Sequence, residues 1–288
     1  MNPEMSVKFR SAQGFIAALD QSGGSTPKAL KLYGIEESEY SGDDQMFDLV
    51  HQMRTRIIKN STFKGDRVLA AILFEGTMDR DIDGVGSAEY LWNSKNIVPV
   101  VKVDKGLADE ENGAQVMKPM PELDALLSRA REKGVFGTKM RSVIKDNTDA
   151  GVAAVVNQQF DIGLQILDAG LVPIIEPEVD IHSATKAEIE ESLRDKLAAS
   201  LDSVPEGKQV VFKLSLPSQA NFYAPLIDHP KVMRVVALSG GYSPDEACTM
   251  LAANHGMIAS FSRALSEGLT AQMSEEEFTA TLDAAIAE

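Results

Sequence analysis

The chain has 288 residues, of which 44% are hydrophobic and 25% are charged, a composition typical of a globular protein with a large core. It has 43 acidic and 28 basic residues, and its net charge of −15 opposes binding to nucleic acids and to anionic membranes. The single cysteine excludes an internal disulfide and indicates a reducing, cytoplasmic location. The polar first 13 residues predict no signal peptide, and no apolar run is long enough to span a membrane.

Eight short apolar runs follow one another along the chain. Most are rich in Val, Ile or Leu, which is typical of parallel strands that are buried on both faces. In chain order they are residues 15–20, 68–74, 98–104, 137–144, 171–179, 209–216, 234–240 and 257–263. These eight runs are the predicted strands.

Helix signals occupy the intervals between the runs. Residues 45–58 place apolar side chains on one helical face, and residues 150–169 are followed by Gly170, a typical C-terminal stop. Three serines are predicted N-caps: Ser183 of a helix running to about Leu201, Ser243 in a capping box with Glu246, and Ser274 in a capping box with Glu277.

Strands that alternate with helices in a chain of this length predict a (β/α)8 TIM barrel, with residues 1–288 forming a single domain. The alternative is a doubly wound open sheet, which favours a glycine-rich fingerprint after its first strand. Residues 21–25 follow the first run but lack the G-x-G-x-x-G spacing. The barrel is therefore the favoured architecture.

Charged residues recur in the predicted strands at a spacing of two, which puts both members of a pair on one strand face. The pairs are Lys102 and Asp104, Lys139 and Arg141, and Glu176 and Glu178, with Lys213 two residues before Ser215, while Asp20 and Arg263 end the first and eighth runs. In a barrel the helix-facing side is apolar, so we expect these charges inside, near the C-terminal mouth. The alternative is a structural ion-pair network, which is costly to bury for stability alone.

Lys213 is the candidate nucleophile. Apolar neighbours enclose it, and burial favours the neutral amine form of a lysine, as does a second cation such as Lys139. A neutral amine attacks a ketone to form a Schiff base, and the protonated imine stabilises a carbanion. Glu176, Glu178 and Asp20 would supply the proton carriers.

Two loops carry a phosphate signal. Ser239 and Gly240 end the seventh run and Gly241 follows it, while Ser260, Ser262 and Arg263 lie at the end of the eighth. Barrels often bind phosphate with the loops after strands seven and eight, through exposed backbone N–H groups, hydroxyls and arginine.

Seven motifs in the same order resemble class I fructose-bisphosphate aldolases, especially the shorter bacterial form. They are residues 17–22 (AALDQS), 102–106 (KVDKG), 139–141 (KMR), 173–178 (PIIEPE), 212–214 (FKL), 237–241 (ALSGG) and 262–265 (SRAL). The resemblance implies reversible cleavage of fructose 1,6-bisphosphate to dihydroxyacetone phosphate and glyceraldehyde 3-phosphate through a lysine Schiff base. This sequence differs from the animal members of the family at Ala29, where they carry an arginine, and at Met140, where they carry a tryptophan.

The resemblance also implies residue roles. Lys213 would form the Schiff base, Glu176 would relay protons, Asp20 would take the proton of the C4 hydroxyl, and Lys139 and Glu178 would set charge and position. The implied substrate- and phosphate-binding residues are Ser239, Gly240, Gly241, Ser262, Arg263, Arg141, Lys102, Ser22, Ser25 and Lys28.

No metal and no cofactor is expected. A metal-dependent aldolase is disfavoured because none of the four histidines lies in a predicted strand or has zinc-site spacing. Another Schiff-base enzyme, such as a transaldolase, and a non-catalytic sugar-phosphate sensor are the remaining alternatives. The expected partners are small sugar phosphates, not nucleic acid or membrane, and the sequence carries no prediction of an oligomeric state.

Overall fold

The computed structural model describes residues 2–21, 25–261, 265 and 268–287. Within these residues, eight parallel strands follow one another in the order β1–β2–β5–β7–β8–β9–β10–β11. They are β1 (Phe15–Leu19), β2 (Val68–Leu73), β5 (Val98–Lys102), β7 (Gly137–Ile144), β8 (Val172–Val179), β9 (Val210–Ser215), β10 (Val232–Leu238) and β11 (Met257–Ala259). Because β11 also contacts β1, the sheet curls into a nearly closed barrel, and the predicted (β/α)8 fold is confirmed.

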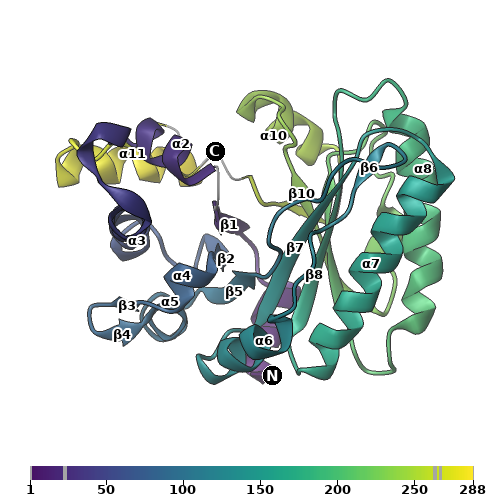
Figure 1. Ribbon diagram of the computed structural model, residues 1–288, viewed down its shortest axis with the longest axis horizontal. Coiled ribbons are helices and arrows are strands. Elements are labelled where there is room, and N and C mark those ends of the chain that lie inside the picture. The colour runs from purple at the N-terminus through teal and green to yellow at the C-terminus, as the bar shows by residue number, and fades with distance from the viewer. Residues whose placement is uncertain (1, 22–24, 262–264, 266–267, 288) are drawn as a thin grey trace.

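The helices surround this sheet (Figure 1). They are α1 (Pro3–Ser11), α2 (Ser25–Leu32), α3 (Gly42–Lys59), α4 (Glu75–Met78), α5 (Ser87–Lys95), α6 (Leu123–Glu132), α7 (Asp149–Asp168), α8 (Lys186–Ser200), α9 (Ala224–Ile227), α10 (Pro244–Ala252) and α11 (Glu275–Ala287). The short elements are the 3-10 turns η1 (Glu37–Glu39) and η2 (Leu201–Ser203) and the strands β3 (Asp81–Ile82), β4 (Val85–Gly86) and β6 (Ala114–Gln115). No helix among the described residues is long and apolar enough to cross a membrane.

The two faces of the strands separate into two apolar clusters. Alternate residues such as Ile72, Val100 and Ile174 form a smaller cluster inside the barrel. The residues between them, such as Met140 and Phe212, pack in the larger cluster against the helices. This is the alternation expected when both faces of a strand are buried, and it leaves the inward positions near the strand ends for polar side chains.

Helix α1 covers the N-terminal end of the barrel. Its buried residues Met5 and Phe9 belong to the interior cluster, and the Phe9 ring stacks on Phe136 with 5.3 Å between centroids. Asn2 caps the helix by accepting a hydrogen bond from the Glu4 backbone N–H at 2.9 Å. The sequence pattern did not predict this helix, because only two of its nine residues, Met5 and Phe9, are buried and the rest of the segment is largely polar.

The C-terminal helix α11 lies beside α2 and α3, which are far from it in the sequence (Figure 1). Arg56 of α3 pairs with Glu275 at 2.8 Å, and its guanidinium carbon lies 4.1 Å from the ring centroid of Phe278. The Ser274–Glu277 capping box that opens α11 forms as predicted. The connection between β1 and β2 is therefore fixed against the end of the chain.

Several predicted boundaries were wrong. Ser183 is not an N-cap, because α8 begins at Lys186 after Thr185, and the Ser183 hydroxyl instead accepts a hydrogen bond from the Thr185 backbone N–H. The first and third strands end before Asp20 and Asp104, and β11 ends at Ala259. Beyond two of these ends a further backbone hydrogen bond still reaches the next strand, from the Val103 N–H to the Lys139 carbonyl and from the Ser260 N–H to the Ala237 carbonyl. The Ser243 capping box of α10 was predicted correctly.

Candidate active site

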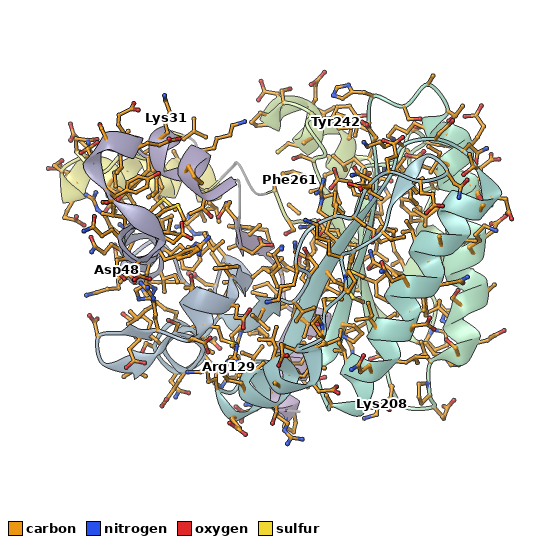
Figure 2. The ribbon with its side chains drawn as sticks, viewed as in Figure 1. Lys31, Asp48, Arg129, Lys208, Tyr242 and Phe261 are labelled. Atoms are coloured by element: carbon orange, nitrogen blue, oxygen red, sulfur yellow. The ribbon has the colours of Figure 1, made fainter. Side chains whose placement is uncertain are left out.

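A cavity of about 650 Å³ opens at the C-terminal ends of the strands. Figure 2 marks this end by Tyr242 and Phe261, which follow β10 and β11, and the opposite end by Lys208, which precedes β9. The cavity is lined by Ala18, Asp20, Gln21, Lys102, Asp104, Gly106, Leu107, Lys139, Arg141, Glu176, Glu178, Lys213, Leu238, Ser239, Gly240, Gly241 and Ser260. Four cations and four carboxylates thus meet in it, whereas the whole chain carries a net charge of −15.

A chain of ion pairs crosses the floor of this cavity. Lys213 Nζ lies 2.8 Å from Glu176 Oε1, and Glu176 Oε2 lies 3.1 Å from Lys139 Nζ. Lys139 Nζ continues the chain to Asp20 Oδ2 at 2.7 Å. All four side chains are at most 10% exposed; three come from the strands β7, β8 and β9 and Asp20 directly follows β1, so the curvature of the sheet brings them together.

Lys139 controls the ionisation of the two carboxylates. Burial on its own would raise the pKa of Asp20, but the attraction of Lys139, followed by that of Lys213, holds this pKa below its usual range. The pKa of Glu176 is lowered in the same way, by Lys139 and then Lys213 acting against burial. Burial opposes the charge of Lys139, yet Asp20 and Glu176 raise its pKa well above the usual value. Both carboxylates are therefore ionised at neutral pH.

A helix residue on the outer side of the barrel also holds the backbone of Glu176 in place. Gln159 of α7, which is fully buried, accepts a hydrogen bond from the Glu176 backbone N–H at 2.9 Å and donates one to Ser142 Oγ at 3.1 Å. Within the described part of the chain, Glu176 Oε2 receives no well-aligned hydrogen bond, although Lys139 lies 3.1 Å away. That oxygen can accept a proton from a molecule in the cavity.

A second charged group lies next to this chain, because Lys102 of β5 is the register partner of Lys139 of β7. Lys102 Nζ lies 2.7 Å from Asp104 Oδ1, and Asp104 also accepts a hydrogen bond from the Arg141 backbone N–H at 3.2 Å. Arg141 Nε donates to Glu178 Oε2 at 2.6 Å, and 39% of the Arg141 side chain is exposed. Arg141 is thus the most open of these cations and can turn toward an anionic ligand.

The loop after β10 brings its backbone to the cavity. Gly240 has φ of +62°, which disfavours other residues, and a Cβ added there would lie 2.8 Å from Ile181 Cγ2. The tight turn places Ser239, Gly240 and Gly241 together in the lining. Such a turn exposes N–H groups that can bind phosphate.

Ten of the candidate residues named from the sequence meet in this one cavity: Asp20, Lys102, Lys139, Arg141, Glu176, Glu178, Lys213, Ser239, Gly240 and Gly241. Lys28 is exposed on α2 and does not line the cavity. Ser22, Ser262 and Arg263 lie outside the described residues, and so does the side chain of Ser25, whose backbone begins α2.

Ser260 belongs to the segment in which the sequence predicted phosphate binding, but it was not among the binding residues named there. It lines the cavity with a buried hydroxyl that has no hydrogen-bond partner among the described residues. Gln21 was also missed, although it directly follows Asp20. No group of three His, Cys, Asp or Glu side chains in the described chain is arranged to hold a metal ion.

Known proteins share both the sequence and this fold. The profile of the family described as fructose-bisphosphate aldolase class-I matches residues 7–212. A fructose-bisphosphate aldolase class 1 of Synechocystis sp. is 60% identical over 99% of this chain and 95% of its own length. One of Porphyromonas gingivalis is 54% identical over 99% of this chain and 97% of its own. The solved aldolase of Plasmodium falciparum, in complex with TRAP and an inhibitor, covers 98% of this chain and 91% of its own with a TM-score of 0.76, and its 19% identity supports the fold alone.

Proposed function

This chain belongs to the class I fructose-bisphosphate aldolase family, and we propose that Lys213 carries its chemistry. The protein is a lyase that reversibly cleaves fructose 1,6-bisphosphate to dihydroxyacetone phosphate and glyceraldehyde 3-phosphate through a Schiff base, a step of glycolysis and gluconeogenesis. The observation that supports Lys213 is its 2.8 Å ion pair with Glu176, at one end of a chain of charges that leads to Asp20.

In the first stage Lys213 forms the imine. Glu176, as the nearest base, takes a proton from the Lys213 ammonium, and the free amine attacks the C2 ketone of the open-chain sugar. Glu176 then returns the proton to the C2 hydroxyl of the carbinolamine, which leaves as water. The product is a protonated imine that can accept the electron pair of a neighbouring carbon–carbon bond.

In the second stage Asp20 acts as the general base. It takes the proton of the C4 hydroxyl, the C3–C4 bond breaks, and its electron pair flows into the imine to give an enamine and glyceraldehyde 3-phosphate. Protonation at C3 and hydrolysis of the imine then release dihydroxyacetone phosphate and restore Lys213. Lys139 supports this role because it keeps Asp20 ionised, at 2.7 Å.

The remaining candidates hold the substrate. Ser239, Gly240, Gly241, Ser262 and Arg263 bind the phosphate of the dihydroxyacetone end, and Ser22, Ser25 and Lys28 bind the other phosphate. Lys102, Arg141 and Glu178 orient the chain of the sugar between them, which is supported by their place in the cavity lining.

We also propose that residues 1–288 form one domain, and that the protein works in the cytoplasm, as its single cysteine suggests.

The substitution Lys213→Arg tests the nucleophile. A guanidinium keeps the positive charge beside Glu176 but cannot form the imine. The variant should therefore show the circular dichroism spectrum of the folded wild type but no longer cleave fructose 1,6-bisphosphate. Lys145→Arg is the matched control, because Lys145 forms an exposed ion pair with Glu110 and does not line the cavity. Cleavage by the folded Lys213→Arg variant at the rate of the control would overturn the assignment.

A further inference from the structure

A buried arginine lies directly behind the mouth of the barrel and belongs to none of the ion pairs described above. Arg54, on α3, is 1% exposed, and it is among the largest fully buried side chains of the described residues. Burying a charged guanidinium is costly unless it is paired or performs a function. Its surroundings should therefore indicate what it does.

Arg54 joins the loops that follow the first two strands. Its Nη2 donates to the backbone carbonyl of Gln21 at 2.5 Å, one residue after Asp20. Its Nη1 donates at 2.8 Å to Oγ1 of Thr77, a buried residue of α4 after β2. The guanidinium carbon also lies 5.8 Å from the ring centroid of Phe74, the residue between β2 and α4. One planar group thus holds two strand ends in register at the mouth.

The charge of Arg54 also interacts with Asp20. Burial lowers the pKa of its guanidinium to about 10, and the attraction of Asp20 opposes this effect, so the group remains positive at neutral pH. Asp20 also faces Lys139 from β7, Lys213 from β9 and Lys102 from β5. Arg54 differs from these lysines because its hydrogen bonds go to the Gln21 carbonyl and to Thr77; among the described residues, Gln21 is the one cavity-lining residue to which it is hydrogen-bonded.

We propose that Arg54 is a positioning residue for carbon–carbon bond cleavage, which fixes the end of β1 so that the Asp20 carboxylate stays within reach of the C4 hydroxyl. This inference rests on the proposed function, in which Asp20 is the base of the cleavage step and Lys213 forms the imine without it. It follows that loss of Arg54 should slow cleavage while imine formation continues. A general collapse of the site would slow both.

The test compares two measurements in Arg54→Met, which keeps the length of the side chain but removes its donors. Cleavage of fructose 1,6-bisphosphate should fall by about 10- to 100-fold, the effect of misplacing a catalytic group by about 1 Å. The yield of borohydride-trapped adduct with dihydroxyacetone phosphate should stay within about two-fold of wild type, since a well-positioned Lys213 does not need Asp20 to form it. Arg54→Lys keeps a charge but has one donor nitrogen in place of the two that reach Gln21 and Thr77, so its rate of cleavage should lie between those of wild type and Arg54→Met.

Arg80→Met is the matched control. Arg80 holds the same helix, through an ion pair with Asp48 at 2.7 Å and a hydrogen bond to the Phe47 carbonyl at 3.2 Å, but it does not contact Gln21. Its loss should leave both measurements within about three-fold of wild type, as expected for an exposed pair. Equal losses in the Arg54 and Arg80 variants would attribute the effect to α3 as a whole and overturn the proposal.

A double-mutant cycle decides whether Arg54 acts through Asp20. In an Asp20→Asn background, Arg54→Met should cause less than about a two-fold further loss of cleavage, because the positioned group has already been removed. Fully multiplicative losses would overturn the proposal, and so would wild-type cleavage in Arg54→Met. Absence of any adduct in the wild-type protein would instead refute the imine on Lys213, so failure of the proposed function is distinguishable from failure of this inference.

Discussion

We predict that Lys139 contributes several kcal/mol more to the free energy of unfolding than a solvent-exposed lysine of the same protein. It is 4% exposed and lies 2.7 Å from Asp20 and 3.1 Å from Glu176. At an effective dielectric constant of about 20 each contact corresponds to a gross attraction of about 5–6 kcal/mol, most of which offsets the cost of burial. Lys139→Met leaves two buried carboxylates without this partner, so we expect a loss of about 3–5 kcal/mol in the free energy of unfolding.

The matched control is Lys145→Met. Lys145 also lies 2.7 Å from a carboxylate, Glu110, but the two side chains are 37% and 47% exposed. Exposed pairs contribute only about 0–1 kcal/mol, so the two substitutions differ in burial rather than in chemistry. Urea unfolding at pH 7, followed by circular dichroism, measures both. Equal losses in the two variants would refute the argument that burial makes the Lys139 contacts strong.

The pH dependence of this loss has a defined sign. The pKa values of Asp20 and Glu176 are lower in the folded protein than in the unfolded chain, so their contribution is present above about pH 4 and is lost as the pH falls through the folded-state values. The pKa of Lys139 is raised, so its contribution is complete below about pH 10. The difference between Lys139→Met and wild type should therefore be constant from pH 6 to 8 and shrink toward pH 3. A difference that grows on acidification would contradict this assignment.

Three further outcomes follow from the fold and the chemistry. Phe9→Ala, which removes the ring stacked on Phe136 under the barrel, should lower the free energy of unfolding by about 3–5 kcal/mol in a urea titration, and a loss below 1 kcal/mol would contradict its core role. Ser274→Ala should cost about 0.5–2 kcal/mol through the lost cap of α11, whereas the exposed Ser203→Ala should cost less. Cleavage should survive EDTA, because the imine is the electron sink; activity that is lost and then restored by zinc would exclude this mechanism.

Apolar patterning was sufficient to predict the barrel, for a physical reason. Each strand is covered by helices on one face and by the barrel interior on the other, so it appears in the sequence as a short, nearly continuous apolar run. Where the pattern is interrupted, as at Lys139 or Glu176, the side chain faces the cavity. The strand ends were harder to predict because Asp20 and Asp104 follow the same alternation after the ladder has stopped.

Other features depend on contacts between distant segments, which a local pattern does not contain. Arg54 occurs in an amphipathic helix, where a charged residue usually indicates a solvent-exposed face, yet the loops after β1 and β2 bury it. The short helix α1 has only Met5 and Phe9 to bury, and its position depends on the open end of the barrel. The partners of Ser183 likewise depend on a turn rather than on a helix start.

Borohydride trapping is the most direct test of the lysine mechanism. The protein is incubated with dihydroxyacetone phosphate and reduced, and the modified peptide is identified by mass spectrometry. The chemistry proposed here predicts one stable adduct, on Lys213, which lies beside Glu176 in the cavity. An adduct on another lysine, such as Lys139 or Lys102, or no adduct at all, would contradict it.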